Sequence, residues 1–508
     1  SARNTLMAYD STPTQLTIGL ALISVGLIGT IYFYLTRNHK YWQKRGVPGP
    51  QPWPFFGTYL KQFFVPFLET EIAMVQSIWQ NLWNLRWFKT WHHRWRPRFD
   101  QTNHVGEEWK RVRSIVTPTF TSSKMKNLFH IMKNSSNDML EKLEKAAAEE
   151  NGEIDLKKLY GGYTMNVIAK CAFATEADSE FENNATQLFT FPFWRKFLDY
   201  TVPMWWLDFI KFTVLPQGAM GFFRSITVGL INQRVSTNQQ YREHYHDFLE
   251  LLMNAKRLGS GEISKSIKDI DDASFRKETD DEKTLNQNAL SDTTAYDGKK
   301  KLDENEILAQ CVLFFSVGFE TSSQLLAYCT YCLALNPDCQ ETLHNEIVET
   351  INSNHGEFNY NMVPKMIYLD AIISETLRLY NPVLRMERQA SENYTLGSTG
   401  IIIEKGMIVG IPVWALHHDP QYYPEPDLFK PERFLAGNRE RLVPYTYLPF
   451  GTGPRNCIGA RFALLETKIA LIKVVSKYRF VESKTTRIPL RFLPVGRPLL
   501  RCEHIATG

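Results

Sequence analysis

The chain has 508 residues, a formal net charge of +4 and an apolar content of 44%. This composition is typical of a globular protein and excludes a disordered one, and so small a net charge does not indicate a nucleic-acid partner. Seven cysteines at irregular spacing argue against a disulfide framework and for a reducing compartment.

The first predicted element is a membrane-spanning helix. Residues 16–35 are mostly apolar, and at about 1.5 Å per residue they match a bilayer core of about 30 Å. A cleaved signal peptide is the alternative, but no small-residue cleavage pattern follows the apolar run. The residues that follow are basic, which predicts a cytoplasmic location for the rest of the chain: Arg37, Lys40, Lys44 and Arg45. We expect an uncleaved anchor with its basic flank over 1–45 and, because residue 1 is serine, a candidate start at Met7.

A stiff connection and an unusual segment come next. Alternate prolines predict an extended, proline-rich hinge over 46–57. Residues 58–105 lack glycine and place tryptophan at every fourth position from Trp79 to Trp95. Three interpretations stay open: a membrane-interface or base-stacking surface, a divergent helical patch, or a mistranslated or mis-spliced replacement for lost exon sequence, which we favour.

The remainder is expected to be mainly α-helical with small β-sheets. Apolar residues recur at three- and four-residue spacing in 122–150 and 244–257, which predicts helices. Residues 256–300 are highly charged and predict a solvated, disordered loop, and 401–416 predicts short strands. The apolar stretch 191–212 suits either an entry channel that dips into a membrane or ordinary core.

A long apolar run over 307–337 contains one charged residue, Glu320. A second membrane span is conceivable, but the polar residues 320–324 would be costly in lipid and no basic flank precedes the run. The central helix of a large domain is the better interpretation, and an acid in its middle must be satisfied or functional.

One cysteine stands in a distinctive setting, in the sequence FGTGPRNCIG over 450–459. A helix beginning at about Ile458 would direct its unsatisfied N–H groups toward the Cys457 thiol and favour loss of its proton. Gly451, Gly453 and Gly459 permit tight turns and the close approach of a flat, bulky group. The residues alone leave a nucleophile, a redox centre and a metal ligand open.

This segment resembles the haem-binding loop of the cytochrome P450 superfamily, F-x-x-G-x-R-x-C-x-G, from Phe450 to Gly459. Other motifs of that family occur in its order along the chain: W-x-x-x-R from Trp109 to Arg113, Gly318 to Thr321, E-x-x-R from Glu375 to Arg378, and P-E-R-F from Pro431 to Phe434. The C-terminal half is similar to the microsomal group that includes the vertebrate drug- and steroid-oxidising subfamily and related invertebrate enzymes.

The resemblance implies a P450 fold over 58–508 that binds haem b, iron protoporphyrin IX, with Cys457 as the thiolate ligand of the iron. The remaining residues expected to contact the haem are Trp109, Arg113, Arg388, Phe450, Gly451, Arg455 and Gly459, with Arg385 a weaker candidate than Arg388. Glu375, Arg378 and Arg433 are implied to form a buried, structural ion-pair triad.

The resemblance also implies a proton relay. Glu320 and Thr321 match the acid and alcohol that supply protons for oxygen activation, and Gly318 is expected to let the helix open locally. Val317 replaces a smaller residue of the family and would narrow the space for oxygen or substrate. Residues 58–105 depart from the family, which has a β-hairpin and a substrate-contacting loop in this region.

The implied function is that of a haem-thiolate monooxygenase in the endoplasmic reticulum membrane, with its catalytic domain in the cytoplasm. Electrons would come from NADPH-cytochrome P450 reductase, with cytochrome b5 as a further partner, and the substrates would be O2 and a lipophilic xenobiotic, steroid or fatty-acid-like molecule. Two alternatives stay open: a P450-fold isomerase or dehydratase that needs no reductase, and an inactive haem-binding relic.

Overall fold

The structure is a computed structural model. It describes residues 13–37, 39–41, 43–45, 88–89, 107–120, 122–148, 153–189, 195, 198, 204–213, 216–236, 247–257, 302–396, 400–488, 490 and 499–504. The chain divides into two compact units, one made of Ser1–Arg94 with Glu387–Gly410 and the other of Trp95–Met386 with Ile411–Gly508. The proposed hinge over 46–57 and the charged loop beyond residue 257 lie outside the described residues.

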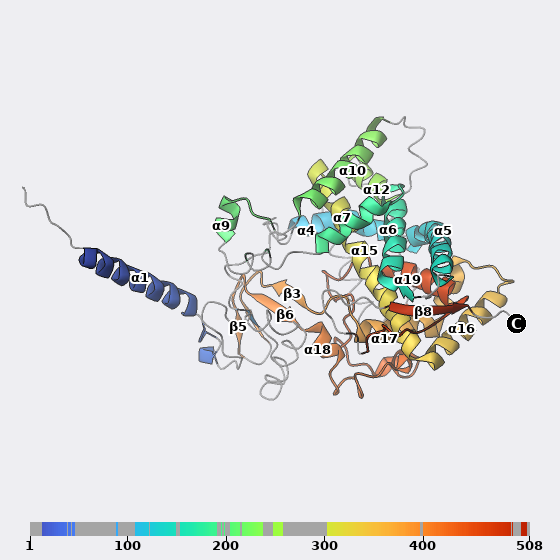
Figure 1. Ribbon diagram of the computed structural model, residues 1–508. Coiled ribbons are helices and arrows are strands. Elements are labelled where there is room, and N and C mark those ends of the chain that lie inside the picture. Colours follow the sequence, from blue (N-terminus) through green and yellow to red (C-terminus); the bar gives the residue numbers. More distant parts are fainter. Residues whose placement is uncertain are drawn as a thin grey trace, which may run out of the picture. The chain divides into compact units, whose positions relative to one another are not determined.

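The larger unit is mainly helical, as expected, and α15 (Glu304–Leu335) runs through it with α6 and α19 alongside (Figure 1). Its other helices are α4 (Glu107–Val116), α5 (Ser122–Ala147), α6 (Leu156–Phe173), α7 (Ser179–Phe189), α9 (Met204–Phe209), α10 (Gln217–Ser236), α12 (Phe248–Arg257), α16 (Pro337–Asn352), α17 (Ile367–Leu379), α18 (Val413–His417) and α19 (Ala460–Val475). Short 3-10 helices connect them: η3 (Thr117–Phe120), η6 (Tyr360–Lys365), η8 (Pro431–Phe434) and η9 (Arg439–Arg441).

The central helix α15 starts at a capping box. The Asp303 carboxylate accepts a hydrogen bond from the Glu306 N–H at 2.8 Å, and the Glu306 carboxylate accepts one from the Asp303 N–H at 2.9 Å. Residues on several faces of α15 are buried. The helix is therefore the core element that the sequence favoured over a second membrane span.

A close contact between α15 and α6 explains why residue 318 is a glycine. A Cβ atom at this position would lie 2.6 Å from Cδ1 of Ile168, well inside van der Waals contact. The helix is α-helical throughout Glu304–Leu335. The expectation that Gly318 opens the helix was therefore wrong; the glycine lets two helices approach.

Two hydrophobic clusters of the larger unit meet at the cysteine segment. One joins α5, α6, α16, α17, α19 and the C-terminal half of α15, and Phe450 packs against it. The other joins α4, α6, α7, α10, α12 and the N-terminal half of α15, and Ile458 packs against that one. The residues on either side of Cys457 are thus held by different parts of the core.

The sheets are small and antiparallel where their pairings are described. In the larger unit the strand order is β2 (Glu153–Asp155), β8 (Leu499–His504) and β7 (Tyr478–Glu482), with Ile154 opposite Leu500 and Phe480 opposite Cys502. The remaining strands are β1 (Phe88–Lys89), β6 (Ile408–Ile411) and β3 (Met386–Gln389) in one sheet, and β4 (Tyr394–Thr395) with β5 (Ile402–Ile403) in another. The strands expected within 401–416 are therefore present, followed by α18.

Strand β1 corrects part of the interpretation of residues 58–105. Phe88 and Lys89 pair with Val409 and Ile408 of β6, so the tryptophan-rich segment supplies a strand here. A helical patch is wrong for these two residues. The rest of 58–105 lies outside the described residues.

The smaller unit also contains α1 (Pro13–Thr36) and η1 (Gln43–Arg45). Among the described helices, α1 has a stretch, Thr17–Tyr34, that is long and apolar enough to cross a membrane. The Tyr41 hydroxyl donates to the Glu404 carboxylate at 2.5 Å, and the Arg45 guanidinium contacts the same carboxylate at 3.2 Å. The basic flank of the predicted anchor therefore contacts the turn between β5 and β6.

The larger unit encloses an unusual carboxyl group, that of Glu466 on α19. The side chain has no exposed surface, and neither oxygen has a hydrogen bond of good geometry in the described part of the chain. Burial raises the pKa of this carboxyl well above its usual value, and the nearby Ser322 hydroxyl opposes the shift only in part. Glu466 therefore keeps its proton to a higher pH in the folded protein than in the unfolded chain.

Replacing Glu466 with glutamine should remove a pH dependence of stability. Between the usual and the raised pKa, the folded chain keeps a proton that the unfolded chain has released, so the free energy of unfolding falls as pH rises, by up to about 1.4 kcal/mol per pH unit. We expect the Tm of Glu466→Gln relative to wild type to increase from about pH 5.5 to about pH 8. Glu349→Gln, at an exposed position on α16, is the control, and equal pH profiles for the two variants would contradict the assignment.

Candidate active site

The segment that carries Cys457 is a compact loop between Leu448 and α19. The Gly451 N–H donates to the Leu448 carbonyl at 3.2 Å, and the Cys457 N–H donates to the Phe450 carbonyl at 2.9 Å. Gly451 and Gly453 have φ angles of 72° and 76°, which other residues rarely adopt. The predicted role of these glycines in tight turns is confirmed.

The thiol of Cys457 is less acidic than the sequence predicted. Cys457 has exposed surface, yet surrounding protein atoms raise the pKa of the thiol by desolvation, against the smaller opposing effects of the Gly459 N–H and Arg113. The helix α19 begins at Ala460, with Gly459 as its N-cap, two residues later than expected. The free thiol is therefore protonated at neutral pH, and a metal bound by it would have to displace that proton.

Two arginines and a tryptophan that the resemblance implies as haem contacts lie beside this loop. Nη2 of Arg113 donates to the backbone carbonyl and to the side-chain oxygen of Asn456, at 3.1 and 2.9 Å. The Arg455 guanidinium lies over the Trp109 ring, 4.5 Å from its centroid. Burial lowers the pKa of Arg113, with Cys457 opposing and Arg455 adding to the shift. A cationic edge thus adjoins the thiol.

Arg388 belongs to the smaller unit. It lies on β3, where its Nη1 donates to the carbonyl of Glu387 at 2.9 Å. Its predicted role beside the haem therefore stays a prediction.

One face of α15 carries the predicted alcohol. Leu313, Val317 and Thr321 follow one another at four-residue spacing and share this face. The side chains of Leu313 and Val317 are 44% and 46% exposed, although the helix is otherwise largely buried. The Thr321 hydroxyl donates to the Val317 carbonyl at 2.9 Å. The face therefore combines exposed apolar surface with one hydroxyl.

Glu320 has partners of its own. Its Oε1 lies 2.8 Å from Nζ of Lys157 on α6, and it accepts a hydrogen bond from the Gln324 side chain at 2.9 Å. The Lys157 ammonium also donates to the Ser323 hydroxyl at 3.0 Å. The sequence did not predict Lys157, because nothing in its local pattern marks it as the partner of an acid far along the chain.

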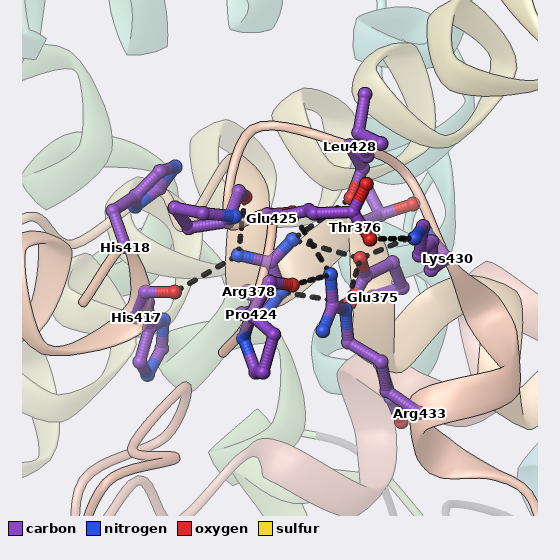
Figure 2. A network of polar contacts seen from close by, with 12 residues as sticks. Glu375, Thr376, Arg378, His417, His418, Pro424, Glu425, Leu428, Lys430 and Arg433 are labelled. Atoms are coloured by element: carbon purple, nitrogen blue, oxygen red, sulfur yellow. Dashed lines mark hydrogen bonds and ion pairs between the residues drawn. The ribbon is translucent and has the colours of Figure 1, made fainter. Parts of the chain in front are cut away.

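The buried ion-pair triad is confirmed. Glu375 and Arg378 have no exposed surface, and their side chains form two hydrogen bonds of 2.7 and 2.8 Å (Figure 2). Arg433 approaches the same carboxylate, with Nε 3.4 Å from Oε1, and the Lys430 N–H donates to it at 2.9 Å. The carboxylate is thus paired with two guanidiniums and a backbone N–H, as a buried charge requires.

The guanidinium of Arg378 also holds the chain around it. It donates to the backbone carbonyls of His417, Pro426 and Leu428 at 2.9, 2.8 and 3.2 Å, while Arg433 donates to those of Pro424 and Glu425. Every nitrogen of Arg378 therefore has a partner. The segment 417–430, which has little regular structure, is fixed by these bonds.

Comparison with known proteins gives concordant results. The family model described as Cytochrome P450 matches residues 69–500. The chain is 33% identical over 506 residues to Cytochrome P450 3A15 of Cavia porcellus, with 92% of each protein covered. It is 31% identical over 515 residues to Cytochrome P450 3A29 of Sus scrofa, covering 94% of this chain and 93% of the relative, and 32% identical over 522 residues to Cytochrome P450 3A9 of Rattus norvegicus, covering 94% and 95%.

Replacing Arg378 with lysine should be strongly destabilising. Lysine keeps the charge but cannot serve two carboxylate oxygens and three carbonyls at once, so buried acceptors lose their partners. We expect the free energy of unfolding to fall by about 3–5 kcal/mol, the usual effect of breaking a buried ion pair. Thermal unfolding measures this change. Arg479→Lys is the control, because Arg479 pairs with Glu341 at the surface, where both side chains are about half exposed; a similar loss in both variants would refute the special role of Arg378.

Proposed function

The chain belongs to the cytochrome P450 family and is a monooxygenase, and from this premise we propose that it inserts one oxygen atom of O2 into a lipophilic small molecule. The observation that carries the proposal is the setting of Cys457. Its thiol is exposed, and it lies in a loop that turns at two glycines and has guanidinium groups beside it. A P450 uses such a cysteine as the axial ligand of haem iron.

The residues of the larger unit fit a haem group. Cys457 offers the sulfur, Gly451 and Gly453 remove side chains from the loop before it, and the exposed apolar face of α15 offers a surface for a flat ring. Arg113, Arg455 and Trp109 are the proposed donors to the anionic propionates, and Arg388 is a further one. We infer haem b, which supplies the activation of O2 when bound.

The protein then has to supply protons in a dry site. Thr321 is the proposed proton donor, because its hydroxyl lies on the α15 face that carries exposed apolar surface and can exchange its bond to the Val317 carbonyl for one to a substrate oxygen. Glu320 is proposed as the second member of the relay, which would take up a proton from solvent and pass it to the Thr321 oxygen after Thr321 has donated its own. To do so, the carboxylate would have to exchange its contacts with Lys157 and Gln324 for one with the Thr321 hydroxyl.

A lipophilic substrate of xenobiotic, steroid or fatty-acid-like character suits this arrangement. Leu313 and Val317 present apolar surface on the face of Thr321, and Val317, which replaces a smaller residue of the family, would narrow the space for oxygen or substrate. On and beside α9, Trp206, Phe209 and Ile210 are 46%, 81% and 44% exposed, so the core interpretation of 191–212 is wrong for them. Their exposure supports contact of the substrate entrance with a membrane.

The length and apolar character of α1 support the proposal that it anchors the protein in the endoplasmic reticulum membrane. The catalytic domain is proposed to lie on the cytoplasmic side, because the span is followed by basic residues: Arg37, Lys40, Lys44 and Arg45. The proposed electron donors are NADPH-cytochrome P450 reductase and cytochrome b5. We propose no nucleic-acid partner.

Replacing Cys457 with alanine should abolish thiolate ligation. We expect purified wild type to give the reduced carbon-monoxide difference spectrum of a thiolate-ligated haem, and Cys457→Ala to lose that spectrum and all turnover. Cys339→Ala, which changes a half-buried cysteine on α16, should retain both. A colourless wild-type protein produced in haem-supplied cells would refute the proposed function.

Replacing Thr321 with valine tests the proton relay. Valine preserves the shape but removes the hydroxyl, so electrons from NADPH should be diverted from product to hydrogen peroxide, with a drop in product formation of about 10²-fold or more. Thr321→Ser should retain most of the coupling. NADPH consumption, peroxide and product are measured together with reconstituted reductase, and reductase-independent conversion of an oxygenated lipid would favour an isomerase or dehydratase instead.

A further inference from the structure

We propose that His417 is a positioning residue, which fixes the loop that carries Cys457 relative to the buried Glu375–Arg378 pair. This proposal rests on the proposed role of Cys457 as the haem ligand. The histidine belongs to none of the family motifs quoted from the sequence, and it neither contacts Cys457 nor carries charge. Its contribution is geometric.

The backbone of His417 is bound to the ion pair. His417 is the last residue of α18 (Val413–His417), it has no exposed surface, and its carbonyl accepts a hydrogen bond from Nη1 of Arg378 at 2.9 Å (Figure 2). Because Arg378 is itself fixed by two bonds to Glu375, the Cα atom of His417 is held relative to α17. The position of the imidazole ring therefore depends on the triad.

The ring of His417 reaches in the other direction, to the start of the cysteine loop. Its Nε2 accepts a hydrogen bond from the Leu448 N–H at 2.8 Å, which requires the neutral ring to carry its proton on Nδ1. Burial lowers the pKa of His417 to about 3, with Arg378 adding to the shift. The ring is consequently neutral at physiological pH, and Nε2 remains an acceptor.

Leu448 connects this bond to the thiol. Its carbonyl accepts from the Gly451 N–H at 3.2 Å, and the Phe450 carbonyl accepts from the Cys457 N–H at 2.9 Å. The Leu448 side chain packs against Val413 and Leu416 of α18, so backbone and side chain are both fixed to the element that ends in His417. In a loop with glycines at 451 and 453, which restrict the backbone little, such external bonds decide where the sulfur lies.

His418 provides a matched control. It is adjacent in sequence and its ring stacks on Trp414, with a centroid separation of 3.1 Å, while its Nδ1 lies 3.0 Å from the Trp414 carbonyl. These contacts remain within the α18 segment. A change at His418 therefore disturbs the same region without removing the acceptor of the Leu448 N–H.

The experiment compares His417→Phe, His417→Gln, His417→Asn and His418→Phe with wild type as purified full-length holoenzymes. Hydrogen exchange at the Leu448 amide reports the bond itself, and the reduced carbon-monoxide difference spectrum reports thiolate ligation. We expect His417→Phe to exchange Leu448 about tenfold faster, because a buried N–H loses its partner, and to convert a large share of the thiolate spectrum to one without thiolate. His418→Phe should match wild type in both.

The amide variants separate a positioning role from loss of folding. Gln can place its side-chain oxygen close to the position of Nε2, whereas Asn is too short, so Gln should restore slow exchange and the thiolate spectrum and Asn should not. This comparison decides the question even if His417→Phe does not fold. Equal behaviour of Gln and Asn, or wild-type exchange in His417→Phe, would overturn the proposal.

The two readouts also separate this proposal from the proposed function. A wild-type protein without the thiolate spectrum refutes the role of Cys457, whereas exchange at Leu448 still tests the bond to His417. A wild type with that spectrum that is unchanged in His417→Phe, despite faster exchange at Leu448, refutes the link to the sulfur alone.

Discussion

The structure depends on one carboxylate that has no access to water. Glu375 is paired in the core with Arg378 and Arg433 and accepts a hydrogen bond from the Lys430 N–H, because leaving a buried carboxylate without partners would cost several kcal/mol. The same guanidinium of Arg378 satisfies three backbone carbonyls. A segment with little regular structure thereby becomes rigid, and it can serve as a support for the chemistry next to it.

That rigidity is what the cysteine loop needs. The loop has glycine turns and an exposed sulfur, and it gains its position from neighbours: Phe450 and Ile458 pack against different core clusters, and Leu448 donates to His417. A metal ligand must be held closely for its metal to keep a constant environment. The ion pair and the thiol are distant in sequence but are connected through these contacts. The helix α15 contributes something different, an exposed apolar face that carries a hydroxyl.

Several features of the site could be predicted from the sequence. The glycines before Cys457 indicated tight turns by themselves, whereas the arginines beside Cys457 and the triad of Glu375, Arg378 and Arg433 were implied by the resemblance of short motifs to those of the family. Features that depend on packing were predicted less well. Gly318 serves a helix contact with Ile168, and desolvation makes the Cys457 thiol less acidic, although its place before a helix suggested the reverse.

The sequence by itself determined the elements and their chemistry: an apolar N-terminal helix, a mainly helical unit with a long central helix, and a cysteine loop of the P450 kind. These are encoded in composition, periodicity and residues that are near one another in the chain. Only the tertiary structure decided which partners those residues meet, such as Lys157 for Glu320, His417 for Leu448 and β6 for Phe88. Such pairings arise when distant segments are brought together to bury apolar surface and satisfy buried polar groups, and no local pattern records them.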